Sequence, residues 1–309
     1  MVIADTTRVP TPPPVPCRPQ RIVTADGLAL AAQWHAPDAA MPRTPVVMAH
    51  GFGQTRQAWA RSASALARAG HPTLAFDARG HGESERNPAH VRYAGEQFVD
   101  DLEAVSTHCR EAPVLVGASM GGLLGLLAQA RQPRYSALVL VDITPRWEPA
   151  GVNRILDFMG AHPDGFDSLE HAGAEIARYL PHRRERKGPG QLRALLREGE
   201  DGRWRWHWDP RLLTEFARDS HQHQHRMMEA ASKVAVPVLL LSGGRSDLVS
   251  DDTVREFLAL VPHARHTRLP DATHMVAGDD NDAFTAEVLD FLSAPGNLLP
   301  TGTTPGESR

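Results

Sequence analysis

The sequence predicts an α/β protein built around a mostly parallel sheet. Short runs that are apolar throughout recur along the chain, as expected of strands that are covered on both faces. Stretches with apolar residues at helical spacing separate these runs, so that strands and helices alternate. One run ends in a Gly-x-Ser-x-Gly turn that leads directly into a helical stretch. We therefore expect parallel strands connected by helices that lie on both faces of the sheet.

The first expected element is a β-hairpin, and the alternating strands and helices follow it. Residues 21–34 alternate in polarity around Asp26-Gly27, a dipeptide that favours a tight turn between antiparallel strands. Apolar strands are expected at residues 45–49, 73–76, 114–116, 138–141 and 238–241, and a last strand at 265–269. Helical spacing covers residues 59–69, 96–109, 122–130, 253–261 and 282–292.

The regular alternation stops after residue 144, where helical, aromatic and basic residues prevail. We interpret residues 145–231 as a helical lid inserted into a core formed by residues 21–144 and 232–295. Such an insertion would lie above the carboxyl ends of the strands, where open α/β sheets bind ligands. Six prolines from Pro10 to Pro19 predict that residues 1–20 are an extended, disordered tail. We expect the same of residues 296–309.

The composition narrows the class of partner. The chain has 309 residues, with 33 Lys and Arg against 37 Asp and Glu, so nothing in its charge predicts binding to nucleic acid or to an anionic membrane. We expect a small-molecule partner and a monomer or homodimer. The two cysteines, Cys17 and Cys109, form neither a disulfide framework nor a zinc motif, and no secretory signal or spanning run is visible. These features favour a cytoplasmic protein.

Ser119 is the candidate nucleophile. It lies at the centre of the turn Gly117 to Gly121, between a predicted strand and a predicted helix. Small residues two positions before and after the serine let its hydroxyl stand clear of the sheet. The helix that begins beside it directs free backbone amides toward any negative charge that develops on a substrate oxygen. This arrangement indicates nucleophilic attack on a carbonyl group.

A nucleophilic serine needs a base, and the base needs a carboxylate to orient it. His274 is the candidate base, because it follows the last predicted strand and precedes the final helix. Asp247 is the favoured carboxylate, since it lies just past the apolar strand at 238–241. Asp142 is the rival, at the end of the preceding strand; Asp251 and Asp252 are further alternatives.

The developing oxyanion requires two hydrogen-bond donors. The backbone amide of Met120, directly after the nucleophile, is expected to be one of them. The other is expected from the loop after the strand at 45–49, which reads His-Gly-Phe-Gly at residues 50–53. In that loop, the amide of Phe52 is the candidate donor, and its ring would add an apolar wall to the acyl pocket.

Taken together, these motifs resemble those of the α/β-hydrolase superfamily over residues 21–293. The matching stretches are residues 50–56, 77–84, 117–122, 243–247 and 274–279. The stretches 142–146 and 204–210 resemble a bacterial branch that includes hydrolases of monoalkyl phthalate esters. The resemblance implies an α/β-hydrolase fold with a helical lid, and a cofactor-independent serine hydrolase that cleaves carboxylic esters through an acyl-enzyme. Phe52 departs from the pattern, because glycine is usual at that position.

Four residues are candidate substrate contacts: Arg56, Arg146, Trp147 and Trp204. An arginine that turned inward could clamp a substrate carboxylate by two hydrogen bonds, which would favour a monoester of a dicarboxylic acid such as phthalate. Two alternative reactions would use the same triad: hydrolysis of a carbon–carbon bond, and perhydrolysis. A further alternative, from another class, is a receptor of the same fold that binds a small ligand.

A metal site is not expected. His221 and His225 would share one helix face, but no carboxylate or cysteine is spaced to complete a site with them.

Overall fold

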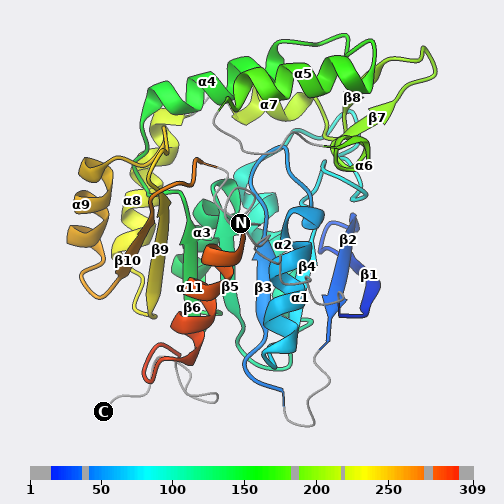
Figure 1. Ribbon diagram of the computed structural model, residues 1–309. Helices are drawn as coiled ribbons and strands as arrows, with labels where there is room; N and C mark the ends of the chain where they lie inside the picture. Colours follow the sequence, from blue (N-terminus) through cyan, green and yellow to red (C-terminus); the bar gives the residue numbers. More distant parts are fainter. Residues whose placement is uncertain (1–14, 37–41, 182–187, 217–219, 275–280, 299–309) are drawn as a thin grey trace, which may run out of the picture.

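In the described residues, eight strands form one sheet in the order β1-β2-β4-β3-β5-β6-β9-β10 (Figure 1). The computed structural model describes residues 15–36, 42–181, 188–216, 220–274 and 281–298. The strands are β1 (Cys17–Val23), β2 (Ala29–His35), β3 (Val46–Ala49), β4 (Thr73–Phe76), β5 (Val114–Ala118), β6 (Ala137–Val141), β9 (Val238–Gly243) and β10 (Arg265–Leu269). Strand β2 runs antiparallel to β1 and β4, and the other pairs are parallel.

Successive residues of the central strands face opposite sides of the sheet and join two separate cores. In β5, Leu115 belongs to one core, whereas Val114 and Val116 belong to the other. All three side chains are buried because helices cover both faces. This double burial explains why the strand sequences are apolar throughout rather than alternating.

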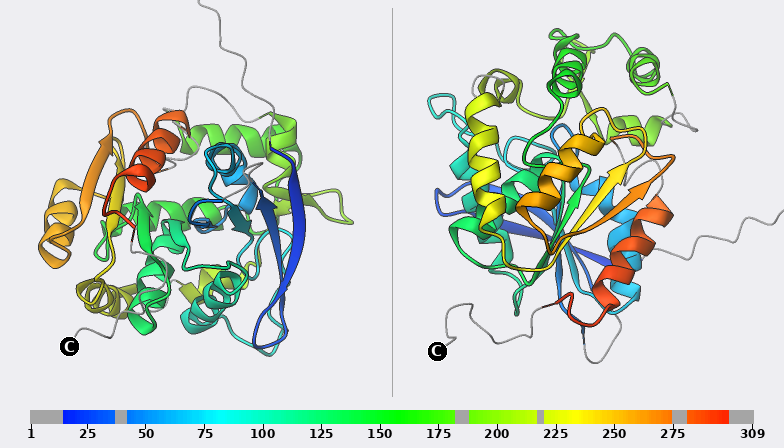
Figure 2. Two further views of the ribbon diagram at one scale, coloured as in Figure 1. Left: turned by 90° about the horizontal axis from the view of Figure 1, so that it is seen from below. Right: turned by 90° about the vertical axis from the view of Figure 1, so that its left-hand side faces the viewer.

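Two groups of helices cover the faces of the sheet (Figure 2). One core includes residues of α2 (Gly95–Ser106), α3 (Met120–Arg131), α8 (Ser220–Ser232) and α9 (Asp251–Leu260). The other includes residues of α1 (Ala60–Arg68), which follows the short helix η1 (Arg56–Trp59), and of α11 (Asn281–Ser293). The alternating strands and helices expected from the sequence are therefore present.

Residues 145–231, which we call the insertion, separate β6 from β9. Its elements are α4 (Pro149–Gly160), α5 (Leu169–Tyr179), α6 (Pro189–Arg193), β7 (Leu196–Glu198), β8 (Trp204–Trp206), α7 (Arg211–Phe216) and α8. Strands β7 and β8 form a small antiparallel sheet, which the helical interpretation did not include. Figure 1 shows α4, α5 and α7 above the carboxyl ends of the large sheet.

The expectation of a disordered tail over residues 1–20 is wrong from Cys17 onward. Strand β1 begins there and pairs with β2, and Pro19 lies opposite Gln33. Because β1 is an edge strand, the missing amide hydrogen of Pro19 interrupts no interior hydrogen bonding. Residues 1–14 and 299–309, the remainder of the expected tails, lie outside the described residues.

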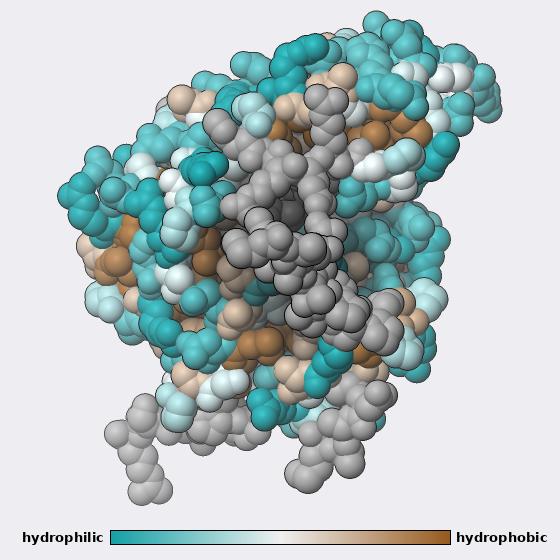
Figure 3. Space-filling view, viewed as in Figure 1, coloured by the Kyte–Doolittle hydropathy of each residue, from teal (hydrophilic) through white to brown (hydrophobic). Residues whose placement is uncertain are grey.

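The surface of the described part is mainly polar. Figure 3 shows hydrophilic side chains over α9 and over the outer side of the insertion. Among the described residues, the exposed large hydrophobic side chain is Val23, at 66%. No helix in this part of the chain combines the length and the apolar character needed to cross a bilayer.

Candidate active site

Ser119 occupies a strained turn between β5 and α3. Its backbone has φ 46° and ψ −112°, and its amide donates a hydrogen bond to the carbonyl of Val141 at 3.0 Å. Among the described residues other than glycine, Ser119 and Asp142 have positive φ angles. Such a conformation is costly for a residue with a side chain and is typical of functional turns. The turn therefore has the geometry of a nucleophile elbow.

The glycines on either side of Ser119 are required by close backbone packing. A Cβ atom on Gly117 would lie 2.6 Å from the backbone of Gly121. A Cβ atom on Gly121 would lie 2.4 Å from the carbonyl oxygen of Ala49 in β3. Backbone atoms cannot swing aside as a flexible side chain can. The Gly-x-Ser-x-Gly pattern is thus the consequence of three backbone segments that meet at this turn.

Asp142 lies at the end of β6 and contacts His274. Its carboxylate is fully buried and accepts a hydrogen bond from Nδ1 of His274 at 2.8 Å. The amide of Gly243 and the hydroxyl of Ser246 also donate to this carboxylate, at 2.7 Å and 2.5 Å. Because Nδ1 carries the proton of this hydrogen bond, Nε2 is the basic nitrogen of a neutral His274.

The preference for Asp247 as the partner of His274 is wrong, and the rival Asp142 takes this position. The Asp247 carboxylate binds Arg154 of α4 at 3.0 Å, and about a third of this side chain is exposed. A Cβ atom on Gly151 of α4 would lie 2.2 Å from the Asp247 carbonyl oxygen. Asp247 therefore contacts the insertion. The reason is topological: β6 is the immediate neighbour of β5, so the residue after β6 lies beside the turn that carries Ser119.

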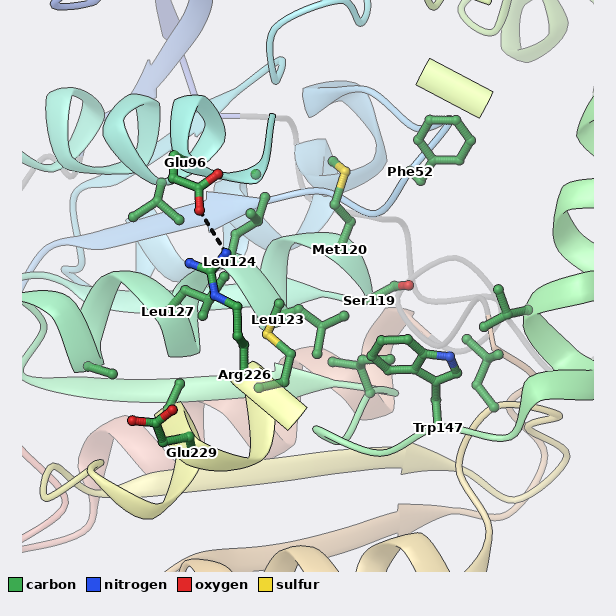
Figure 4. A pocket seen from close by; sticks show the side chains of 18 of the residues that line it. Phe52, Glu96, Ser119, Met120, Leu123, Leu124, Leu127, Trp147, Arg226 and Glu229 are labelled. Atoms are coloured by element: carbon green, nitrogen blue, oxygen red, sulfur yellow. Dashed lines mark hydrogen bonds and ion pairs between the residues drawn. The ribbon is translucent and has the colours of Figure 1, made fainter. Parts of the chain in front are cut away.

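The expected oxyanion residues lie next to Ser119. The loop that follows β3 packs against the elbow, because a Cβ atom on Gly51 would lie 3.4 Å from Cβ of Ser119. Phe52 of this loop and Met120, the first residue of α3, line the same cavity as Ser119 (Figure 4). Phe52 and Met120 therefore line the same cavity as Ser119, and their role as oxyanion donors stays a prediction.

Comparison with known proteins identifies the family. A family model described as "Alpha/beta hydrolase family" matches residues 46–288, which is most of the chain. The chain belongs to the alpha/beta hydrolase family. It is 28% identical over 250 residues to a 3-hydroxybutyrate-oligomer hydrolase of Cupriavidus necator, covering 77% of this chain and 84% of that protein.

Two further proteins are similar to this alpha/beta hydrolase. Esterase YbfF of Escherichia coli K12 is 28% identical over 264 residues, which cover 81% of this chain and 93% of the esterase. The crystal structure of an alpha/beta hydrolase from Novosphingobium aromaticivorans superposes with a TM-score of 0.73 at 25% identity. That match covers 90% of this chain and 98% of the other chain.

An apolar cavity of about 520 Å³ opens beside Ser119 in this alpha/beta hydrolase. It extends along α3 between α2 and α8 (Figure 4), and residues of α4 in the insertion line it as well. The residues that line its inner end are Phe52, Ser119, Met120, Leu123, Ile143, Trp147, Val152, Ile155, Leu156 and Leu248. A substrate in this cavity would leave water and meet mainly hydrocarbon.

Two buried histidines hold the loop that carries Phe52. Nε2 of His81 accepts a hydrogen bond from the amide of Gly53 at 3.2 Å. His207 of the insertion accepts from the amide of Gly82 at 2.8 Å through Nδ1, and its Nε2 donates to the carbonyl of Gly53 at 3.2 Å. The sequence analysis included His207 in the stretch 204–210 but gave it no role, because nothing in the pattern places it beside residues 50–53.

Burial keeps these imidazoles neutral. Burial, with a smaller effect of the nearby His50 in the same direction, lowers the pKa of His207 to about 3. The pKa of His81 lies well below its usual value, again because of burial, followed by the effects of His50 and His207. A neutral ring can accept a backbone hydrogen bond through one nitrogen and donate through the other. The loop beside Ser119 is thus stabilised by uncharged histidines.

Of the four residues expected to contact substrate, Trp147 alone lines the described part of the cavity. Arg56 binds the buried Asp77 and also Glu83. Arg146 binds Glu256. Trp204 belongs to β8, where its ring lies 5.1 Å from the guanidinium of Arg193. The two arginines and Trp204 do not line the described part of the cavity, and their contact with substrate stays a prediction. The basic run at residues 182–187 lies outside the described residues.

One group in the described residues brings three possible metal ligands together: His162, His171 and Glu175, in the insertion. Glu175 also binds Arg178 at 2.5 Å, and Nδ1 of His171 accepts from the amide of Asp167 at 3.4 Å. Glu175 and His171 therefore each have a partner outside the group. The side chain of His221, from the other histidine pair considered, lies outside the described residues.

Proposed function

We propose that this alpha/beta hydrolase is a serine hydrolase that cleaves carboxylic esters through an acyl-enzyme. The observation that carries the proposal is the position of Ser119, at a strained turn that lines an apolar cavity. This turn adjoins the end of β6, where Asp142 binds His274. The similarity to an esterase supports the same reaction class.

The reaction divides into two steps. In the first, Nε2 of His274 takes the proton of the Ser119 hydroxyl as Oγ attacks the ester carbonyl carbon. The amides of Met120 and Phe52 stabilise the negative oxygen of the tetrahedral intermediate. His274 then gives the proton to the leaving alcohol, and the acyl group stays on Ser119. In the second step, His274 deprotonates a water molecule, which attacks the acyl carbonyl and releases the acid and the free serine.

Asp142 acts on His274 rather than on the substrate. Its buried carboxylate keeps the proton on Nδ1 and stabilises the imidazolium that forms in each step. The donors from Gly243 and Ser246 hold this carboxylate in place and compensate for its burial.

The insertion serves as a lid over the acyl site in this proposal. Val152, Ile155 and Leu156 of α4 line the cavity that contains Ser119. Apolar side chains above the reacting carbonyl exclude bulk water and strengthen the hydrogen bonds in the oxyanion hole.

A neutral acyl group fits the cavity better than one that carries a carboxylate. A monoalkyl phthalate would place its second carboxylate near the ester, where Arg56 and Arg146 are already engaged with Asp77 and Glu256. A buried charge without a partner is costly. We therefore expect a lower kcat/KM for monoalkyl phthalates than for neutral esters of similar size. Measuring kcat/KM for both classes tests this expectation.

The decisive experiment compares the wild type with Ser119→Ala on 4-nitrophenyl butyrate. We expect a burst of nitrophenol from the wild type, covalent labelling of Ser119 by a fluorophosphonate, and a loss of turnover of roughly 10³-fold or more in the variant. Retained activity in Ser119→Ala would overturn the proposal. Product analysis with a cleavable diketone, and with hydrogen peroxide plus acetate, distinguishes ester hydrolysis from carbon–carbon cleavage and perhydrolysis. A receptor would show no repeated turnover of any ester.

A further inference from the structure

The cavity continues outward from Ser119 along one face of α3. Leu123, Leu127 and Ala130 line it, and their spacing of four and three residues places them in one row. All three are half-buried, whereas their neighbours Leu126 and Ala128 are buried in the core. An outward row on a covering helix is normally polar. Here the row is apolar, so this face of α3 presents hydrocarbon from Leu123 to Ala130, and Arg131 follows at the end of the helix.

Helices α2 and α8 form the two walls of this row. Val99 of α2 and Met227 and Ala230 of α8 line the same cavity. Met227 and Ala230 are buried, at 7% and 5% exposure. A floor from α3 and apolar walls on both sides make a channel that suits a flexible hydrocarbon chain rather than a polar group.

The length of the channel follows from helix geometry. Ala130 lies eleven residues beyond Ser119, which corresponds to about 16 Å at a rise of about 1.5 Å per residue. An extended hydrocarbon chain is zigzag, so each bond of about 1.5 Å advances the chain by only about 1.25 Å, and roughly thirteen carbons span this length. Leu127 lies at about 12 Å on the same scale.

The channel adjoins the acyl side of the ester rather than the alcohol side. Phe52 and Met120, whose amides face the acyl carbonyl oxygen in the proposed mechanism, line the cavity together with Ser119. His274, which gives its proton to the departing alcohol, is absent from the described lining. The alcohol must lie toward His274, so the chain along α3 belongs to the acid.

The outer end of the channel is polar. Glu96 of α2 and Arg226 of α8 form an ion pair at 2.7 Å across it, and Glu229 of α8 lies on the same side as Arg226 (Figure 4). Lys233 of α8 also lines the cavity. The side chains of Glu96 and Arg226 are more than half exposed, and a pair of this kind contributes little to stability. It marks the point at which a chain leaves hydrocarbon and reaches water.

We propose that this channel binds the linear acyl chain of the substrate and makes the enzyme selective for esters of medium-chain acids, of roughly eight to twelve carbons. The inference rests on the proposed function and names its substrate class. Each added methylene that enters the channel leaves water. It raises kcat/KM by up to roughly fourfold, until the chain reaches the Glu96–Arg226 pair.

The test uses 4-nitrophenyl esters of linear acids from two to fourteen carbons, below their critical micelle concentrations, with three variants. Leu127→Trp and Ala130→Trp place bulk in the channel at two distances from Ser119. Ser232→Trp places the same bulk on an exposed position of α8 that does not line the channel, and serves as the matched control.

We expect Leu127→Trp to lower kcat/KM for the ten- and twelve-carbon esters at least tenfold, with less than a twofold effect on acetate. Ala130→Trp is expected to affect only the longer chains, and Ser232→Trp none. A wild type without chain-length preference, or Leu127→Trp losses that are equal for all esters, would overturn the inference. An alcohol series of alkyl acetates should show no comparable dependence, and a dependence in that series alone would also overturn it.

Failure of the channel and failure of the proposed function are distinguishable. Short esters that are hydrolysed by the wild type and not by Ser119→Ala support the function, whatever the chain-length result. Binding of decanoate to Ser119→Ala, measured by calorimetry, tests the channel without turnover. We expect binding that is lost in the double variant with Leu127→Trp and kept with Ser232→Trp; absence of binding in Ser119→Ala itself, or binding kept with Leu127→Trp, would count against the channel.

Discussion

Asp142 and His274 are 132 positions apart in the chain, yet the carboxylate of one lies 2.8 Å from Nδ1 of the other. The contact depends on the backbone of Asp142, whose φ of 50° turns the chain sharply at the end of β6. Ser119 makes a similar turn at the end of the neighbouring strand, with a φ of 46°. Two adjacent strained strand ends therefore direct a hydroxyl and a carboxylate to the same edge of the sheet.

The first prediction separates the two carboxylates that the sequence offered. Asp142→Asn should lower kcat for a short ester by roughly 10³- to 10⁴-fold, because the amide no longer holds the productive tautomer of His274. Asp247→Asn should stay within about threefold of the wild type, since Asp247 binds Arg154 on the surface of the insertion. Steady-state kinetics of both variants, with thermal unfolding as a check on folding, decides the matter. A larger loss of kcat in Asp247→Asn than in Asp142→Asn would show that Asp247, after β9, is the carboxylate that orients His274.

The second prediction concerns two neighbouring residues that the sequence treated alike. Trp147 lines the cavity, whereas Arg146 points to Glu256 and is 43% exposed. Trp147→Leu should raise KM about tenfold, equivalent to about 1.4 kcal/mol of lost binding. Arg146→Ala should leave KM within twofold for neutral esters and for monoalkyl phthalates. A phthalate-specific loss in Arg146→Ala would show that this arginine reaches the substrate.

The third prediction tests the packing at the elbow. Gly121→Ala puts a methyl group against the backbone of β3 and should lower the free energy of unfolding by about 3 kcal/mol or more. Gly190→Ala, where nothing lies within 4 Å, is the matched control and should be neutral or stabilising by up to about 1 kcal/mol. Urea unfolding measures both. If the two variants were equally stable, close packing at the elbow would not be the reason for the glycine.

The fourth prediction is a loss of stability in acid. Burial lowers the pKa of His207 from 6.5 to about 3 in the folded protein. Between pH 6.5 and pH 3, this histidine is therefore protonated in the unfolded chain and neutral in the folded one. Stability therefore falls as the pH falls below 6.5, by about 1.4 kcal/mol per pH unit for this residue. His207→Gln should reduce the loss between pH 7 and pH 5 by about 2 kcal/mol, measured by urea unfolding at each pH. Identical losses in both proteins would mean that His207 is already charged in the fold.

The order of the elements was predictable, and the direction of individual side chains was not. The apolar runs and helical spacings identified the parallel strands, and the turn at Ser119 and the position of His274 followed from the strand order. The choice between Asp142 and Asp247 depended on which strand lies beside β5, and the sequence offered a carboxylate after both β6 and β9. Arg56 had the chemistry of a substrate clamp, but its partner Asp77 comes from another strand end, and only the fold brings the two together.

The hydrogen bonds of His207 have a consequence for protein engineering. This histidine belongs to the insertion, yet it joins Gly82 and Gly53, two loops that precede the insertion in the chain. Exchanging the insertion for that of another family member would thus remove a hydrogen bond to the loop that carries Phe52, as well as changing the side chains of α4 that line the cavity. A chimera designed to alter specificity should retain a histidine at this position. Without it, the loss of these hydrogen bonds would lower kcat even where the new insertion suits the substrate.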